Sequence, residues 1–437
     1  MLFRRTGRWF FGVSIFLTSV LVVLSSTVYA AKVTLDYMVL ANEQEYQVMS
    51  RAVEAFEKEN PDIDIRVDWP SPGEYYDKLL VRLASGTAPD ITRIVIEQFQ
   101  GLAIKGAFLD ITSYVEKLRA SDPSFARQWD DYIPVLLTAF RYNGRLYGLP
   151  ADWNNTLIFY NSRLFDEAGI AYPSENWTTD DFVSIAQKLT KWGAKGVQQW
   201  GFATVPDGIF VNLAPWVLTF GGKILNDDWT RVELNRPEGI NGLRFMRDLI
   251  HKYHVHPTLP ELQGTWSGAL FIEERVAMTQ NGRWDVPMFR AGNPKLAFDV
   301  QHQPIGPTGA RGVPFGAASL SISRTTKHPE EALKFVAFVT GPKGQAILNK
   351  LGSSLPVLKS VVASPEFSNP ALPPKSQVRF IEAAKYSQLI PSPPSYGKLA
   401  PVIGTEVLKM LRGEQSPEQT ALNIQTQGDI ILKTPVQ

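Results

Sequence analysis

The sequence VTLDYMVLANEQEYQVMSRAVEAFEKENPDIDIRVDW, residues 33–69, decides the fold. Apolar residues alternate with other residues over 33–39 and again over 63–67, which is the two-residue period of a β-strand. Between these segments, residues 43–60 place apolar side chains at the spacing of one helical face, and Pro61 stops that helix. The stretch therefore predicts a strand, a helix and a second strand in that order.

The same alternation continues toward the C-terminus. A helix is predicted over 74–84 and a strand over 91–96, so the chain opens with a βαβαβ unit and a parallel sheet. Short helices over 102–105 and 113–118 follow, and residues 142–145, Tyr-Asn-Gly-Arg, form a hairpin-like turn. The predicted fold class is α/β.

A second region of alternating structure begins near residue 149. Residues 157–160 read as a strand, and Thr178 with Asp181 forms a capping box that predicts the start of a helix. Further helices are predicted over 239–254, 329–340 and 405–411. Residues 304–316 and 391–397 are rich in Pro and Gly, so we expect crossings or loops there.

Length and composition narrow the class of protein. A chain of 437 residues predicts two or three domains at roughly 100 to 200 residues each. With 44% hydrophobic residues and 44 Lys+Arg against 43 Asp+Glu, the chain can form packed cores, which excludes the disordered classes. Balanced charge argues against a nucleic-acid binder, because neutralising phosphates needs a basic face. The absence of Cys excludes disulfides, zinc–thiolate sites and thiol nucleophiles.

Residues 1–30 have the three zones of an export signal. Arg4, Arg5 and Arg8 form a basic head, an apolar stretch covers 9–24, and small residues lead to Ala30, after which cleavage is expected. The apolar stretch is shorter than the ~20 residues that cross a bilayer, although a retained anchor is the alternative. Because the signal holds no Cys to carry a lipid, we expect a periplasmic protein with no stable membrane insertion after cleavage.

Several patterns imitate chemical sites. His251, His254 and His256 are spaced as closely in sequence as the ligands of many metal sites. However, no carboxylate nearby completes a set of metal ligands, and Pro257 ends the helix beside them. Residues 306–316 are glycine-rich but lack the Lys-Ser/Thr of a phosphate loop. No G-x-S-x-G elbow of an esterase is present. We therefore expect no metal, no cofactor and no catalytic residue.

Aromatic residues stand at the expected ends of strands and helices. Trp69, Trp153, Trp216 and Trp284 each lie near Gly, Pro, Asn or Asp residues. Sugar rings present apolar C–H faces and a rim of hydroxyls, so a sugar site combines flat aromatic rings with acids, amides or Arg. Core packing is the alternative for any single Trp. The pattern as a whole favours a carbohydrate site.

A series of short motifs runs along nearly the whole chain after residue 30. They are LASGTAPDI (83–91), YGLP (147–150), FYNSRLF (159–165), WTTDDF (177–182), FGGKI (220–224), RVAM (275–278), GRW (282–284), KHPEEA (327–332) and GSSLP (352–356). Each motif is weak alone, but their order and spacing resemble those of family 1 extracellular solute-binding proteins of bacterial sugar ABC importers. That family includes maltose-binding protein.

The resemblance implies a two-lobed periplasmic binding protein fold of type II, with a hinge that the chain crosses several times. It implies a first lobe from residues 31–148 plus 312–352 and a second, helix-rich lobe from 149–311 plus 353–437. A di- or oligosaccharide would bind in the cleft and stabilise the closed form, which the transmembrane subunits of an ABC permease recognise. We expect a monomer that leaves its ligand unchanged.

The resemblance also indicates ligand-binding residues. Asp90 matches an aspartate that ends a strand of the first lobe, and Trp284 matches a stacking aromatic residue. Asn154 stands where relatives often have an acid. The other candidates lie in cleft loops or beside the motifs: Asn42, Glu43, Trp69, Tyr75, Asp152, Trp153, Arg283, Phe315 and Gly316, with Trp216, Trp266 and Tyr396 as further ones.

Three other functions remain open. The first is binding of a polyol or a glycerol-phosphate ester, for which Arg283 is the clearest candidate contact to an anion. The second is a secreted glycosidase or lyase, because two carboxyls placed across a cleft cannot be read from sequence order. The third is a cell-wall lectin, which the alternation of helices and strands disfavours because lectin modules are usually all-β.

Overall fold

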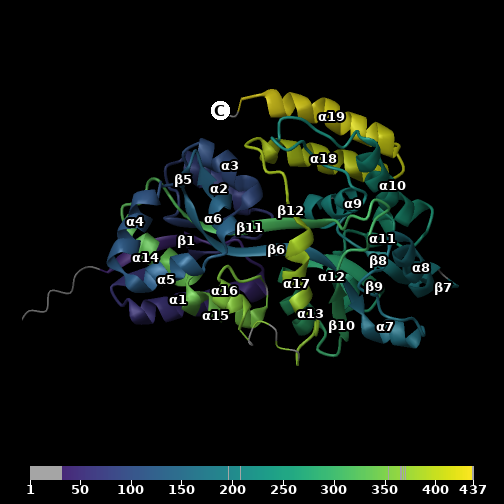
Figure 1. Ribbon diagram of the computed structural model, residues 1–437, viewed down its shortest axis with the longest axis horizontal. Coiled ribbons are helices and arrows are strands. Elements are labelled where there is room, and N and C mark those ends of the chain that lie inside the picture. Colours follow the sequence, from purple (N-terminus) through teal and green to yellow (C-terminus); the bar gives the residue numbers. More distant parts are fainter. Residues whose placement is uncertain are drawn as a thin grey trace, which may run out of the picture.

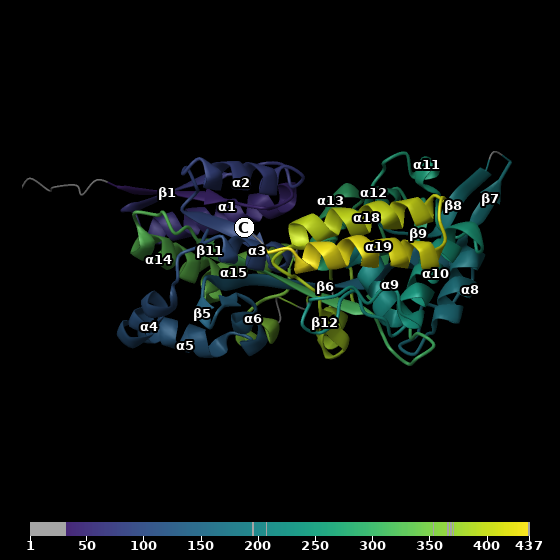
Figure 2. The same cartoon turned by 90° about the horizontal axis from the view of Figure 1, so that it is seen from above.

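The computed structural model describes residues 32–435 apart from Lys195, Asp207, Ser353, Pro365, Glu366, Ser368 and Pro370. The predicted export signal over 1–30 lies outside the described residues. Strands of one long sheet run through the molecule, and helices surround both of its halves (Figures 1 and 2). None of the helices described is long and apolar enough to span a bilayer.

The first strands and helices confirm the predicted βαβαβ unit. β1 (Val33–Met38) pairs in parallel with β2 (Ile63–Asp68) and β3 (Ile91–Val95). The connecting helices are α1 (Glu43–Glu59) and α2 (Tyr75–Ala84). One boundary differs, because β3 ends at Val95 and α3 (Ile96–Ile104) begins at the next residue. Ile96 is buried at the start of the helix, so alternation alone does not separate it from the strand.

Two expected elements before residue 147 are confirmed: a helix over 113–118 lies within α4 (Thr112–Ser121), and the turn joins β4 (Arg141–Tyr142) to β5 (Arg145–Leu146). The helix expected over 102–105 is the end of α3, and α5 (Pro123–Asp131) and α6 (Pro134–Ala139) were not predicted. Asn143 and Gly144 in the turn have φ of 48° and 77°, the left-handed conformation that this type of turn requires.

β6 (Gly148–Asn161) joins the two halves of the sheet, and every one of its residues is buried. Its N-terminal part pairs with β11 (Val313–Ile322), and its C-terminal part pairs with β9 (Val276–Gly282) and β10 (Phe298–Gln301). The order of the sheet is β2-β1-β3-β11-β6-β9-β8-β7, with β12 (Ser387–Leu389) beside β11. The structure is therefore two-lobed, and β6 runs from one lobe into the other (Figure 1).

The second lobe is built around β9, β8 (Gly196–Ala203) and β7 (Lys191–Gly193). The predicted capping box is confirmed at the start of α8 (Thr179–Leu189), where the Thr178 side chain and Asp181 bond each other's backbone N–H. The other elements of this lobe and its connections are α7 (Ser162–Glu167), η1 (Ile209–Leu213), α9 (Ala214–Thr219), α10 (Pro237–His251), α11 (Leu259–Leu262), α12 (Ser267–Ile272), η2 (Arg283–Asp285), α13 (Val286–Gly292), α17 (Val378–Glu382) and η3 (Ala383–Tyr386). α16 (Lys359–Val362) contacts the first lobe, where Ser360 N–H donates to Asp131 at 3.1 Å.

The C-terminal half contains elements that the sequence did not predict in full. Residues 313–316, expected to be a crossing or a loop, are the start of β11, one of the strands at the crossing. α18 (Tyr396–Leu411) is longer than the predicted 405–411, and α19 (Pro417–Lys433) was not predicted. Proline causes these errors: Pro314 lies at an end of its strand, Pro401 lies inside α18, and Pro417 occupies the first turn of α19, where its missing N–H costs nothing.

Four helices after residue 328 divide between the lobes. α14 (Pro329–Thr340), predicted to the residue, and α15 (Pro342–Leu351) pack against α1 in the first lobe. α18 and α19 lie side by side along α10 in the second lobe (Figures 1 and 2). α18 also contacts α3. The segment just before α18 lies close to the same helix, with the Pro394 carbonyl beside Gly101.

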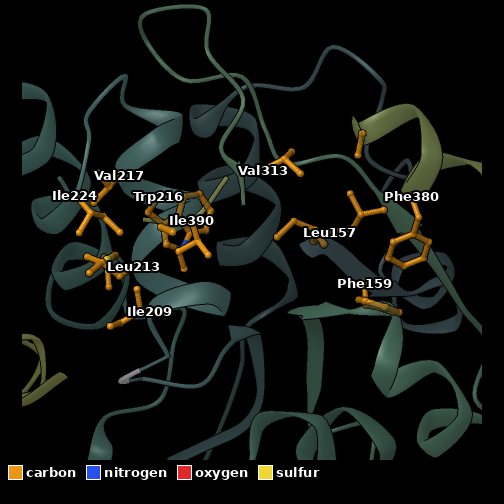
Figure 3. Close-up of a cluster of buried hydrophobic side chains, with 14 of the residues drawn as sticks. Leu157, Phe159, Ile209, Leu213, Trp216, Val217, Ile224, Val313, Phe380 and Ile390 are labelled. Atoms are coloured by element: carbon orange, nitrogen blue, oxygen red, sulfur yellow. The ribbon is translucent and has the colours of Figure 1, made fainter. Parts of the chain in front are cut away.

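A large apolar core, part of which is drawn in Figure 3, fills the second lobe and continues past the crossing strands into the first lobe, where Phe99 belongs to it. Leu157 and Phe159 of β6 and Val313 of β11 belong to it. Trp216 is fully buried in this core, with its ring 4.8 Å from that of Phe245. Trp216 is therefore a packing residue, which was the alternative for any single Trp.

Arg283 ties the second lobe to the segment that follows the first lobe. It is 1% exposed, and its guanidinium donates to the carbonyl of Ser354 and, at 2.9 Å, to Oε1 of Gln377. It also lies 4.3 Å from the ring centroid of Phe367. Both Nη atoms are engaged within the protein, whereas the buried Nε has no partner among the described residues. Because the side chain is buried away from the cavity wall, we do not expect Arg283 to bind an anionic ligand.

We predict that Arg283→Met lowers the free energy of unfolding by about 2–3 kcal/mol, because buried carbonyl acceptors lose a charged donor. Urea unfolding followed by circular dichroism measures the change. The control is Arg275→Met, since Arg275 pairs only with Glu273 and both side chains are more than half exposed. The control is expected to change stability by less than about 0.5 kcal/mol. Equal stability of the two variants would contradict the assignment.

Candidate functional site

A cavity of about 680 Å³ lies between the lobes. The first lobe lines it with Leu40, Ala41, Asn42, Glu45, Pro72, Arg93, Val95 and Glu97. The second lobe lines it with Phe210, Val211, Trp266, Trp284, Asp285 and Met288. The crossing strands β6 and β11 add Asp152, Asn154, Gly316, Ala317 and Ala318. A ligand in this cavity would contact both lobes at once.

A larger hollow, of about 1130 Å³, lies elsewhere, on the outer side of the first lobe. Side chains of α1, α4, α5 and α14 line it, and its rim carries both Lys and acidic residues, such as Lys117 and Glu330. No residue of the second lobe contributes to it. The cavity between the lobes is therefore the better candidate site, because only there can binding change the arrangement of the lobes.

Arg93 organises the polar side of the cavity. Its Nη2 donates to Oδ2 of Asp152 at 2.7 Å and its Nη1 donates to the carbonyl of Leu40 at 2.9 Å. These contacts join β3, β6 and the loop after β1. Arg93 lies near the carboxyl end of β3, and in open parallel sheets ligands bind at that edge.

Three further carboxyl groups, Glu45, Glu97 and Asp285, form what we call the acidic triad. Burial raises the pKa of Glu97 to about 7 and raises the pKa of Glu45. Burial also raises the pKa of Asp285 well above its usual range, and the charge of Glu45 adds to the effect. Among the described residues, none of the three forms an ion pair with a basic side chain, and Arg93 is the only basic residue lining the cavity.

The second lobe supplies an aromatic wall, made of Phe210, Trp266 and Trp284. The Phe210 and Trp284 ring centroids are 5.9 Å apart. Glycine makes room for these rings: a Cβ atom on Gly282 would lie 1.9 Å from the Trp284 ring, and one on Gly316 would lie 2.8 Å from the Phe210 ring. The rings therefore rest directly on backbone, which restricts their movement.

The structure brings five of the predicted site residues together in the cavity wall. They are Asn42, Asp152, Asn154, Trp284 and Gly316. Trp266, a further candidate, joins them. Asn42 also caps α1, since its side chain accepts from the N–H of Glu45 at 2.9 Å. Asn154 is only 9% exposed, and within the described chain its Oδ1 has no hydrogen-bond partner.

Four predicted residues of the first lobe do not line the cavity. The Asp90 carboxylate accepts from the Asp36 N–H at 2.9 Å and from the Thr326 hydroxyl at 2.6 Å, so it holds loops together. Tyr75 is fully buried, and its hydroxyl donates to the Arg93 carbonyl at 2.8 Å. Glu43 is exposed on the first turn of α1.

Trp69, the fourth, supports the cavity from behind. Its ring stacks on Tyr46 with centroids 4.2 Å apart, and its Nε1 donates to the carbonyl of Ala41 at 2.8 Å. Because Ala41 and Asn42 line the cavity, Trp69 positions the loop without forming part of the wall.

Five other predicted residues also lie outside the cavity wall: Trp153, Trp216, Arg283, Phe315 and Tyr396. Trp153 is buried beside the Phe315 ring, and its Nε1 donates to the Pro356 carbonyl at 2.9 Å. Tyr396 lines a separate hollow of about 520 Å³ between η1 and α18. For these residues a position near a motif did not predict the direction of the side chain.

Sequence reasoning missed Glu45, Arg93, Glu97, Phe210 and Asp285. Glu45, Arg93 and Glu97 follow or end the parallel strands β1 and β3, so the rule for carboxyl ends of strands could have found them. Phe210 and Asp285 gave no comparable signal. Both belong to the second lobe, and only the tertiary arrangement brings them opposite the first.

The histidines form no metal site. His256 accepts from the Thr204 N–H at 3.1 Å, and burial lowers its pKa to about 4, so its ring is neutral. His251 bonds the Leu411 carbonyl at 2.9 Å. Within the described residues, no group of three or more His, Cys, Asp or Glu side chains is placed to hold a metal ion.

Comparison with known proteins gives the family context of this cavity. The family described as bacterial extracellular solute-binding protein matches residues 41–346. A multiple sugar-binding protein of Streptococcus mutans is 26% identical over 384 residues, 80% of each chain. A putative binding protein of Brucella abortus is 24% identical and covers 87% of this chain and 88% of its own.

Solved structures agree with the fold described above. An ABC substrate-binding protein of Listeria monocytogenes in complex with cycloalternan is 28% identical, with a TM-score of 0.82 over 91% of this chain and 98% of that one. A solute-binding protein of Thermotoga lettingae bound to α-D-tagatose is 24% identical, with a TM-score of 0.80 over 92% of this chain and 100% of that one.

We predict that the Glu97→Gln variant changes how stability depends on pH. A carboxyl whose pKa is raised on folding stabilises the protein fully below about pH 4.5 and loses that contribution as the pH rises through about 7. Between pH 4.5 and 8 the original protein should therefore lose on the order of 1–3 kcal/mol relative to the variant. Urea midpoints at both pH values measure this, and parallel pH profiles would argue against a buried Glu97.

Proposed function

Because the chain belongs to the bacterial extracellular solute-binding protein family, we propose that it captures a carbohydrate for an ABC importer. The ligand, a di- or oligosaccharide, binds in the cavity between the lobes. The closed, loaded protein then presents it to the transmembrane subunits of a permease. The named sugar-binding relatives and the structures solved with sugars support this choice of ligand.

One observation carries the proposal: the cavity combines an aromatic wall from the second lobe with carboxyl and amide groups from the first lobe and β6. The flat rings of Trp266 and Trp284 suit the C–H faces of a sugar. Asp152 and Asn154 supply hydrogen-bonding groups for its hydroxyls. The stacking contacts and the hydrogen bonds thus come from different sides of the cavity, so a ligand obtains both only when the two lobes are close together.

Closure follows from this division of the site. A ligand that contacts both lobes binds the closed arrangement more tightly than the open one, so it shifts the population toward closure. The lobes proposed to move comprise residues 31–148 plus 312–352 and residues 149–311 plus 353–437. β6, β11 and the segment 354–358 form the crossings at the hinge.

The other ligand class considered, a glycerol-phosphate ester, is less favoured. A phosphate needs converging Arg or Lys donors. Among the described residues, Arg93 alone supplies such donors to the cavity, and Asp152 already binds it at 2.7 Å. Arg283, the candidate from the sequence, is buried away from the cavity wall.

The proposal includes export and the absence of catalysis. Residues 1–30 act as a cleaved signal, and the protein works as a periplasmic monomer. A binder returns its ligand unchanged. Incubation with oligosaccharides followed by chromatography of the sugars tests this, and any product would favour the glycosidase or lyase alternative.

We predict that at least one sugar raises the thermal midpoint of residues 31–437. A ligand at 100 times its dissociation constant adds about 2.7 kcal/mol of stability. The panel contains mono-, di- and trisaccharides, polyols and sugar phosphates, and calorimetry or fluorescence follows unfolding. Shifts confined to sugar phosphates would favour the ester alternative, and a folded protein that responds to no compound would contradict sugar binding.

We further predict that Trp284→Ala weakens binding of the sugar found in that panel by at least about tenfold, because the site loses a stacking face. Isothermal titration measures the affinity. Trp192→Ala is the matched control, since Trp192 is 65% exposed on β7 and does not line the cavity. Its affinity should stay within about twofold. Gly282→Ala, which crowds the Trp284 ring, should resemble Trp284→Ala more than the control.

A further inference from the structure

The cavity between the lobes has an excess of acidic side chains, whose charge a neutral ligand would not compensate. Four carboxyl side chains line it, from Glu45, Glu97, Asp152 and Asp285, against one basic side chain, Arg93. Asp152 and Arg93 compensate each other through contacts of 2.7 and 3.1 Å. The charge of Arg93 also acts on Glu45, whereas Glu97 and Asp285 have no basic partner among the described residues.

The members of the triad come from both lobes. Glu45 and Glu97 follow β1 and β3, whereas Asp285 belongs to η2 and is 4% exposed. Glu45 acts on Asp285 strongly enough to help raise its pKa. Bringing like charges together at partly or fully buried positions is unfavourable, so these groups either take up protons or need a positive partner. A neutral sugar supplies no such partner.

The opposite side of the cavity also suits a cation. Phe210, Trp266 and Trp284 present aromatic faces, which attract ammonium groups through the ring quadrupole. Their seating on glycine backbone fixes them in place. Independently of the acids, Asn154 is nine-tenths buried in the cavity wall, and its Oδ1 has no donor within the described chain. The residue lines the cavity, so a ligand N–H that reached this oxygen would satisfy it.

Resting on the proposed function, we propose that the carbohydrate bound here is an amino sugar, free or within an oligosaccharide, whose ammonium group lies between the acidic triad and the aromatic wall. The ammonium compensates carboxylates of both lobes at once, so its charge favours the closed arrangement. A sugar with a hydroxyl at the same position binds without this compensation. The selectivity thus depends on charge more than on ring shape.

Matched pairs of sugars test the proposal. Isothermal titration at pH 7 and low salt compares glucosamine with glucose, galactosamine with galactose, and the chitosan disaccharide with cellobiose. Any sugar identified by the thermal panel is added together with its amino analogue. The amino member of at least one pair is expected to bind tenfold or more tightly than its neutral partner, with the ratio falling at high salt.

Two variants test whether the triad is responsible. Asp285→Asn and Glu97→Gln should each lower the ratio of amino to neutral affinity at least fivefold. Glu43→Gln is the matched control. Glu43 lies on α1, the same helix as Glu45, but it is exposed and does not line the cavity. Its ratio should stay unchanged. If Asp285→Asn fails to fold, Glu97→Gln decides.

The outcomes separate this inference from the function on which it rests. Neutral sugars that bind as tightly as their amino partners in every pair would overturn the amino-sugar proposal and leave sugar binding intact. A selectivity that survives in a folded triad variant would also overturn it. No binding of any sugar, neutral or amino, would instead overturn the proposed function.

Discussion

The structure depends on one strand. β6 is fully buried along its fourteen residues, and it pairs with β11 in one lobe and with β9 and β10 in the other. Strand pairing therefore connects the two lobes through β6, with a register shift opposite Ala318 and Ser319. The polar residues Asp152 and Asn154 lie on this strand, at the place where the lobes meet. A cavity at that point is open to ligands and also sensitive to the angle between the lobes.

The two sides of the cavity have different physical origins. On the first lobe, parallel strands end at one edge, and the residues that follow them, including Glu45 and Glu97, collect there. On the second lobe, glycine backbone leaves space that the rings of Phe210 and Trp284 occupy. Charge is thus concentrated on one side and aromatic surface on the other, with Asp285 as the acidic group that the second lobe contributes.

Residues near the cavity divide into those that face it and those that hold it in place. Trp69, Tyr75 and Asp90 fix loops and strand ends by hydrogen bonds to backbone groups. Arg283 does the same for the segment after the first lobe. An aromatic or charged residue next to a motif can either face the cavity or support it from behind. This explains why a site list drawn from motifs contains both kinds.

The sequence by itself determined the α/β class, the βαβαβ opening, the capping box at Thr178 and the two-lobed family, because local periodicity and motif order record these features directly. It also indicated Asn42, Asp152, Asn154, Trp284 and Gly316. Only the tertiary structure decided which side chains share the cavity. The acidic triad joins residues 45, 97 and 285, and Phe210 rests on Gly316, across distances in sequence that no local pattern spans. The direction of a side chain depends on packing between lobes, and packing is not a local property of the chain.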